Sequence, residues 1–216
     1  MQHKKRARSK AAKSDRKDAI IAAAEALLRQ LGYDAMTMQA VAMEAGLGKG
    51  TLYLYFSSRE GLILDVYGRL FDRWVDQFAS HVSQATGVEE FCRIFCHHYK
   101  YDPLFVKLIG FANSYTEPQL DRESYIRGKR AMASRVKKLA GIACQRLDIS
   151  PVLAQKFVWG LLTVASGATQ MSMRPSHPSG DFPQDVTGFI RSTNFETVFL
   201  NAAAPLFASI LQVEKE

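Results

Sequence analysis

The chain has 216 residues, of which 47% are hydrophobic, so it can bury a substantial core in one large domain or two small ones. Its net charge of +7 is concentrated at the N-terminus, because residues 1–17 hold eight Lys or Arg and one Asp while the rest of the chain is balanced. Three cysteines form no paired framework and no apolar run is long enough to span a bilayer, which argues against a disulfide-rich secreted domain and a membrane protein. We expect a cytoplasmic protein with reduced thiols.

The N-terminal segment is expected to be a disordered basic arm over residues 1–14, followed by an amphipathic helix over about 15–31 that ends at Gly32. A basic arm on a neutral body favours a polyanion such as double-stranded DNA as partner. A solubilising tail with no partner is the alternative.

The stretch after this helix has the spacing of a helix-turn-helix. Ala42 supplies a small residue where two helices cross, Gly46 a residue that tolerates positive φ in the turn, and Leu52 an apolar plug. The first helix is expected over about 38–45, with Thr37 able to cap it. The second, over 49–55, is short and exposed enough to enter a DNA major groove.

Apolar residues at helical spacing continue to the C-terminus, and no segment alternates as a strand would, so the fold is predicted to be all-α with about nine helices. Ser57 and Glu60 have the spacing of a capping box at the start of a long helix. Residues 174–184 hold three prolines and a glycine and are expected to be a loop. The remaining helices are expected over about 58–83, 88–99, 102–112, 119–147, 151–173 and 185–213, with Pro205 inside the last.

The order of basic arm, amphipathic helix and the string GLGKGTLYLYFSSRE resembles the N-terminal domain of the TetR/AcrR family of bacterial transcriptional regulators, over about residues 15–67. The resemblance implies a DNA-binding domain over 15–62 and an effector-binding and dimerisation domain over 63–216. It also implies a homodimeric repressor that binds a palindromic operator and is released by a small-molecule effector of unknown identity. An effector-independent DNA-binding activator or architectural protein is the alternative. The sequence holds no nucleophile elbow, phosphate loop or paired His/carboxylate spacing, so we expect no enzyme.

Position by position, the resemblance implies DNA contacts from one set of residues. Lys49 and Thr51 would open the recognition helix, Gly50 would allow close approach, and Arg59 would clamp the DNA backbone. Leu52 is expected to be a core plug, as is Phe56. The complete set is Thr37, Gln39, Lys49, Gly50, Thr51, Tyr53, Tyr55 and Arg59. Gly48 stands where the family often has a capping side chain, which is expected to loosen the turn slightly.

The C-terminal part is rich in aromatic residues, which suit the lining of an apolar effector cavity or, alternatively, a filled core. The cavity candidates are Phe78, Phe95, Tyr99, Phe111, Tyr125 and Phe157. Small and aromatic residues late in the chain suit either a two-fold helical interface or packing within one chain. The interface candidates are Gly160, Gly167, Ala168, Phe195, Phe199 and Ala203. Cys92 and Cys96 share a helical face near two histidines, but their spacing gives weak support for a metal or redox site, so we expect neither metal nor cofactor.

Overall fold

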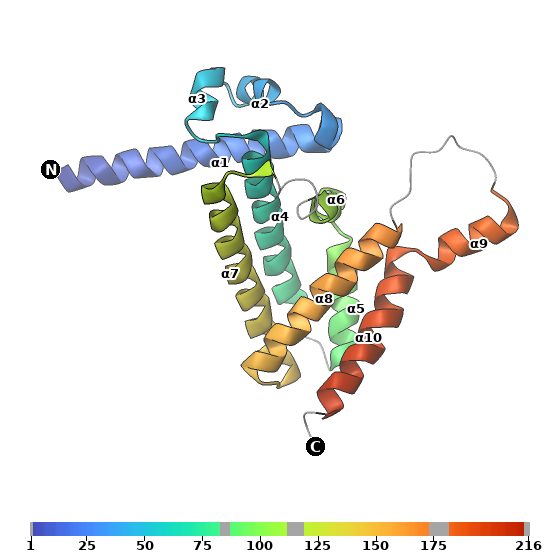
Figure 1. Cartoon of the computed structure of the whole chain (residues 1–216). Coiled ribbons are helices and arrows are strands. Elements are labelled where there is room, and N and C mark those ends of the chain that lie inside the picture. Colours follow the sequence, from blue (N-terminus) through green and yellow to red (C-terminus); the bar gives the residue numbers. More distant parts are fainter. Residues whose placement is uncertain (1, 83–86, 112–118, 173–181, 214–216) are drawn as a thin grey trace. The chain divides into compact units, whose positions relative to one another are not determined.

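The fold is known from a computed structural model that describes residues 2–82, 87–111, 119–172 and 182–213. Within these ranges the chain forms ten helices and no strand (Figure 1), which confirms the all-α prediction. The chain divides into two compact units, Met1–Leu70 with Phe111–Lys129 and Phe71–Gly110 with Arg130–Glu216. These two units are defined by contacts within the chain. The boundary predicted between a DNA-binding domain ending at residue 62 and a second domain starting at residue 63 stays a prediction.

The first unit begins with α1 (Gln2–Ala35), which starts well before the expected residue 15. The expectation of a disordered arm is therefore corrected for residues 2–14, which are helical. The physical reason is composition, since this stretch is rich in Ala, Lys and Arg, which favour helix, and holds neither Gly nor Pro. Gly32 interrupts α1 at φ +81°, so the predicted stop is confirmed.

The helix-turn-helix follows as α2 (Met38–Glu44) and α3 (Lys49–Tyr53), joined by a turn in which Gly46 has φ +64°. α1 packs against α2, and α2 packs against α3. The contact faces are apolar, since Ile20, Ala24, Ala42 and Leu52 are each exposed by 1% or less. Burying a large aliphatic side chain contributes about 1.5–3 kcal/mol, so this small core sets the position of α3.

The start of α4 (Arg59–His81) departs from the prediction. The Oγ atom of Ser58 accepts a hydrogen bond from the backbone N–H of Gly61 at 3.0 Å, so Ser58 caps the helix. The capping box predicted for Ser57 and Glu60 is wrong, because Glu60 pairs with Arg59 and the Ser57 hydroxyl donates to Asp121 at 3.2 Å.

The second unit contains α5 (Val88–Tyr99), most of α6 (Pro103–Phe111), α8 (Pro151–Ser172), α9 (Gln184–Ser192) and α10 (Phe195–Val213). α7 (Arg122–Leu147) begins in the first unit and ends in the second, as α4 does. α10 packs against both α8 and α5.

The C-terminal segment forms two helices where one was predicted over 185–213. Asn194 separates them, because its Oδ1 atom accepts a hydrogen bond from the backbone N–H of Thr197 at 3.1 Å and caps α10. Pro205 lies inside α10, as expected. Of the predicted loop, residues 174–181 lie outside the described part of the chain.

No helix in the described ranges is by itself long and apolar enough to cross a membrane. α7 and α8, which meet at a bend of 114°, pass that test only as a pair and only by length and composition.

Two glycines of α8 differ sharply in the space around them. A Cβ atom on Gly160 would lie 2.5 Å from Cζ of Phe207, whereas a Cβ on Gly167 would meet nothing within 4 Å. Phe207 is 3% exposed and its ring lies 4.8 Å from that of Phe157, so it has little room to move. Of these two glycines, only Gly160 therefore lies where α8 and α10 approach each other closely.

We predict that Gly160→Ala destabilises the protein by about 1–3 kcal/mol, because the added methyl group overpacks the α8–α10 contact. Gly167→Ala is the matched control and should stabilise by about 0.5–1 kcal/mol, because alanine favours a helix interior. Thermal melts followed by circular dichroism measure both. Equal shifts in the two variants would contradict the assigned contact.

Candidate nucleic-acid interface

α3 buries one side chain and exposes the others. Leu52 is 0% exposed, and Phe56 just beyond the helix is 3% exposed, which confirms both as core plugs. Lys49 and Thr51 are exposed, and Tyr53 is 45% exposed. The short helix thus presents a lysine, a hydroxyl and a phenol to solvent, with Gly50 exposed between them.

α2 contributes a second exposed row. The Thr37 hydroxyl oxygen accepts a hydrogen bond from the backbone N–H of Ala40 at 3.1 Å, so Thr37 caps α2 as predicted. Its own hydroxyl hydrogen remains available to donate. Gln39 is exposed, and so is Met43 one turn later, which sequence reasoning did not single out.

The charge of α3 is carried by Lys49, which has no ion-pair partner within the described part of the chain. Arg59 behaves differently: its guanidinium lies 4.7 Å from the Tyr33 ring centroid and donates to the backbone carbonyls of Tyr33 at 3.3 Å and Met36 at 3.5 Å. Arg59 thereby ties the start of α4 to the end of α1, and the DNA contact expected of it stays a prediction. Gly48 provides no side-chain cap for α3, as its lack of a side chain requires.

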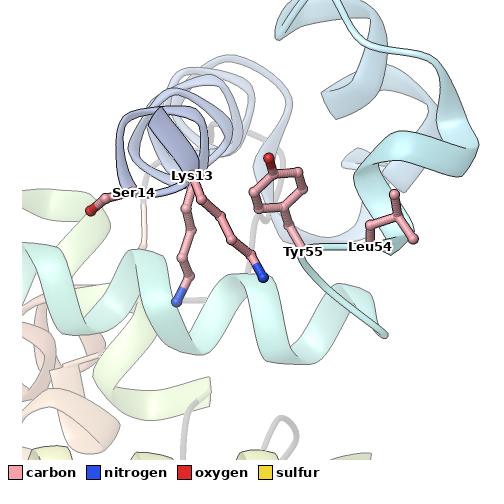
Figure 2. A pocket seen from close by; sticks show the side chains of 5 residues that line it. Lys13, Ser14, Leu54 and Tyr55 are labelled. Atoms are coloured by element: carbon pink, nitrogen blue, oxygen red, sulfur yellow. The ribbon is translucent and has the colours of Figure 1, made fainter. Parts of the chain in front are cut away.

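Two further residues near α3 were missed by sequence reasoning or only partly placed. Leu54 is 79% exposed, an unusual position for a leucine, and the only signal for it is its place within the predicted recognition helix, 49–55. Tyr55, predicted to contact DNA, is half-buried and lines a cleft with Lys13 and Ser14 of α1 (Figure 2).

A polar groove lies between the segment after α3 and the start of α7, and Asp121 organises it. Its carboxylate accepts hydrogen bonds from the backbone N–H and the hydroxyl of Ser124, both at 2.8 Å, and from the Ser57 hydroxyl. The bonds from Ser124, followed by that from Ser57, lower the pKa of Asp121. Asp121 thus caps α7 and holds the α3–α4 loop. The groove, of about 650 Å³, is lined by Tyr53, Leu54, Tyr55, Ser57, Ser58, Gln119, Asp121, Glu123, Ser124 and Arg127.

The predicted cavity residues of the second unit lie in one aromatic cluster. The rings of Phe78 and Phe95 lie 5.8 Å apart, Tyr99 lies 5.8 Å from Phe95, and Phe157 joins through Phe91 at 5.4 Å. Each of the four predicted side chains is 2% exposed or less, so the rings contact one another in a core.

The other two cavity candidates do not join this cluster. Tyr125 belongs to the first unit, is 43% exposed and has the Lys129 ammonium 5.3 Å from its ring, so its prediction as a cavity residue is wrong. The side chain of Phe111 lies outside the described residues.

Trp74 occupies the centre of the cluster, although the sequence analysis did not single it out. Trp74 is 4% exposed, and its indole Nε1 has no hydrogen-bond partner among the described residues. The Tyr99 hydroxyl nearby is paired with Thr169 Oγ1 at 3.1 Å, and burial raises the pKa of Tyr99 to about 12. Trp74 therefore brings a buried donor without an acceptor into the aromatic core.

The two cysteines of α5 are buried, and burial raises the pKa of Cys92 to about 12 and that of Cys96 to about 11. Both thiols are thus protonated at neutral pH and unsuited to metal binding or redox exchange. Across the described ranges, no three His, Cys, Asp or Glu side chains come together as a metal site would require. The thiols pack as small apolar groups.

Most of the residues predicted to form a dimer interface pack against other residues of the same chain. Ala168 is 1% exposed, and Phe199 and Ala203 are 0% exposed, so these three have no surface to offer a second copy and the prediction is wrong for them. Phe195 is half-buried with its ring stacked 4.8 Å from Tyr99, and Gly160 packs on Phe207. Gly167 alone among the six is exposed. Periodicity identified the apolar faces of these helices but not what covers them.

Comparison with known proteins matches both halves of the chain to described families. A model for "Bacterial regulatory proteins, tetR family" matches residues 20–66, and one for "Tetracyclin repressor-like, C-terminal domain" matches residues 68–179. The first range contains the helix-turn-helix described above.

Among curated proteins, the transcriptional repressor KstR of Mycolicibacterium smegmatis is 40% identical over 62 residues, which cover 29% of this chain and 30% of KstR. The chain thus matches less than a third of that relative's length.

Among solved structures, a transcriptional regulator from Rhodococcus sp. Rha1 has a TM-score of 0.57 at 16% identity, covering 91% of this chain and 96% of that one. Thermus thermophilus FadR in complex with lauroyl-CoA has a TM-score of 0.52 at 16% identity, covering 82% and 92%. These likenesses establish a shared fold.

We predict that Asp121→Ala lowers the melting temperature at pH 7, because the α7 cap and the bond to Ser57 are lost together. The carboxylate's pKa is lower in the folded protein, so its stabilisation is present above the ordinary aspartate value of 3.8 and is lost as the pH falls through the folded value. The difference between variant and wild type should therefore shrink in acid.

Thermal melts stepped downward from pH 7 measure this difference. Glu123→Ala, which removes an exposed carboxylate from the same turn, is the control and should change the melting temperature little. A gap for Asp121→Ala that stays constant with pH would contradict the assigned role.

Proposed function

The chain belongs to the TetR family of bacterial regulatory proteins, and from this premise we propose that it is a cytoplasmic transcriptional repressor. In this proposal it binds a palindromic DNA operator as a homodimer and leaves the operator when a small-molecule effector binds. The observation that carries the proposal is the geometry of α3. The buried Leu52 side chain anchors this helix in the core, and Lys49, Thr51 and Tyr53 are exposed.

At the DNA, the exposed side chains of α3 suit two kinds of contact. The Lys49 ammonium, free of internal ion pairs in the described chain, can contact a phosphate or a guanine edge. The Thr51 and Tyr53 hydroxyls can donate to phosphates, and exposed Gly50 lets the backbone come close. Gln39 of α2 can pair with an adenine edge or a phosphate. Few of these groups discriminate bases, so binding should depend strongly on salt.

The dimer proposal rests on apolar side chains that α8 and α10 leave exposed. Val152 and Trp159 of α8 are 66% and 48% exposed, and Leu206 of α10 is 50% exposed. Exposed large apolar side chains on adjacent helices are typical of an interface, and a two-fold axis lets one surface contact its own copy. Two recognition helices held roughly 34–36 Å apart would then read successive turns of one DNA face.

The effector proposal rests on the aromatic cluster and on Trp74. A ligand with an apolar body would replace ring contacts of similar kind, and a carbonyl on it would accept the hydrogen bond that Trp74 Nε1 leaves unmade. A ligand that binds the DNA-incompetent conformation more tightly would shift the population away from the operator.

We predict that Lys49→Ala weakens binding to an operator duplex, selected by the wild-type protein from a random-sequence pool, by about tenfold to a hundredfold. Fluorescence anisotropy measures the affinity, and Lys137→Ala, which removes an exposed lysine of α7, is the charge-matched control.

The selected sequence should be palindromic, and sedimentation of the free protein should give twice the 24.2 kDa chain mass. Equal affinities for the two variants would contradict the proposed DNA contact of α3. A sedimentation mass of one chain would contradict the proposed homodimer.

We predict that lauroyl-CoA, a probe that combines an apolar chain with a thioester carbonyl, lowers the affinity of the wild type for the selected duplex. In Trp74→Phe the effect should be smaller, because the N–H donor is removed while an aromatic ring, smaller than the indole, stays in the cluster. Anisotropy titrations of both proteins, with and without the probe, measure the difference. An identical response would exclude Trp74 from ligand binding, and no response would favour an effector-independent regulator or a different ligand class.

A further inference from the structure

Leu54 has the most exposed large apolar side chain in the described part of the chain, at 79%. It directly follows α3, and its backbone keeps helical dihedral angles, with φ −72° and ψ −18°. Its backbone N–H donates to the carbonyl oxygen of Thr51 at 3.2 Å. Leu54 therefore continues the last turn of α3, and its side chain has a defined direction, although no DNA contact was expected of it.

The buried Leu52 determines where the Leu54 side chain points. Successive residues of an α-helix are about 100° apart, so Leu54 lies about 200° around the axis from Leu52. Because Leu52 is 0% exposed and packs in the core, Leu54 points away from the core. Gly50 is the other residue of α3 on this outward line, and Thr51 and Tyr53 lie at the sides, each about 100° from Leu52. Leu54 is thus the outermost side chain of the helix.

The surroundings of this side chain are open. A Cβ atom on Gly50, one turn before Leu54, would meet nothing within 4 Å. Figure 2 shows the Leu54 side chain apart from Lys13 of α1 and from the Tyr55 ring. The leucine is therefore hydrated in the free protein, and it loses that water only when another molecule docks on the outward face of α3.

We propose that Leu54 recognises thymine in the operator, by contacting the C5-methyl group of one thymine in the major groove. The edges of the bases present hydrogen-bond donors and acceptors there, and thymine alone presents a methyl group. The leucine side chain has neither donor nor acceptor, so this methyl group is the feature that it fits. The inference rests on the proposed function, because α3 has to enter the groove.

The contact distinguishes thymine from the other bases by two effects of opposite sign. Against thymine, two apolar groups leave water together, which favours binding in proportion to the area buried. Against adenine, guanine or cytosine, the leucine would cover a polar group of the base edge and leave that group without a hydrogen bond, which opposes binding. Phosphate contacts carry no such information. Leu54 is therefore a specificity-determining residue.

The charge of α3 favours a duplex over a second copy of the chain as the occupant of this face. The helix holds Lys49 and no acidic residue. Two copies of the face would bring like charges together, whereas a duplex brings phosphates to the lysine. The apolar contact of Leu54 and the ionic contact of Lys49 can thus be made to the same molecule.

The test uses the full-length protein and the duplex that the wild type selects from a random-sequence pool. Each thymine of that duplex is replaced in turn by deoxyuridine, which lacks only the C5-methyl group, and fluorescence anisotropy gives the affinity. At one thymine position of each half-site, loss of the methyl group should weaken wild-type binding by roughly threefold to fivefold. At that position Leu54→Ala should bind the thymine and the deoxyuridine duplexes equally well.

Two variants serve as controls. Leu31→Ala makes the same substitution at another exposed leucine of the first unit, which is 46% exposed. It should keep both the wild-type affinity and the loss on methyl removal. Lys49→Ala should bind every duplex more weakly, but the ratio of its affinities for the thymine and deoxyuridine duplexes should match that of the wild type. Circular dichroism checks that each variant is folded.

Several results would overturn the inference, and each identifies the reason. If Leu54→Ala loses the same factor on every duplex, the side chain packs on DNA without recognising thymine. If no methyl group matters to the wild type while Lys49→Ala still weakens binding, Leu54 has no base contact and the α3 interface stands. If Leu54→Ala changes the sedimentation mass and not the operator affinity, Leu54 contacts a second copy. If the wild type selects no duplex, the proposed function itself fails.

Discussion

A five-residue helix does not persist alone in water, and everything proposed for DNA binding depends on how α3 overcomes this limit. α3 has no side-chain cap at Gly48, so neither capping nor length explains its stability. What remains is burial: Leu52 and Phe56 on one side, with Ala42 of α2 small enough to allow close approach. Because this core also contains α1, the surfaces of α1 and α3 are fixed with respect to each other.

Two polar anchors secure the segments on either side of α3. Arg59 ties the start of α4 to the backbone that precedes α2 through bonds to Tyr33 and Met36, and Asp121 holds Ser57 in the loop after α3. A guanidinium bonded to carbonyls and a carboxylate bonded to hydroxyls are charge-assisted contacts, stronger than neutral ones. α7 begins at Arg122, directly after Asp121, and continues into the second unit, so a change in the cap of α7 reaches the loop after α3 through one side chain.

Sequence patterns predicted those features that short-range physics determines. The Thr37 cap, the Gly32 stop and the bounds of α5 depend on residues within a turn or two, and all three were confirmed. The cap of α4 was misplaced by one residue because Ser57 is drawn away by Asp121, 64 positions later. The same limit explains Ala168 and Ala203: periodicity places them on an apolar face, but only packing decides that the face is covered by the chain itself.

The aromatic core sets a physical condition on any ligand of the second unit. The Trp74 indole lies nearly parallel to Phe78 at 5.5 Å and edge-to-face with Phe95 at 5.2 Å. A buried N–H without an acceptor costs about 1–3 kcal/mol, part of which weak contact with a ring face can offset. A ligand that displaces a ring breaks those ring contacts and must replace them with contacts of its own. A purely apolar molecule therefore gains little binding free energy. An acceptor directed at Nε1 adds a hydrogen bond that the unliganded core lacks, which makes the carbonyl, and not the apolar body, the feature that gives such a ligand its advantage.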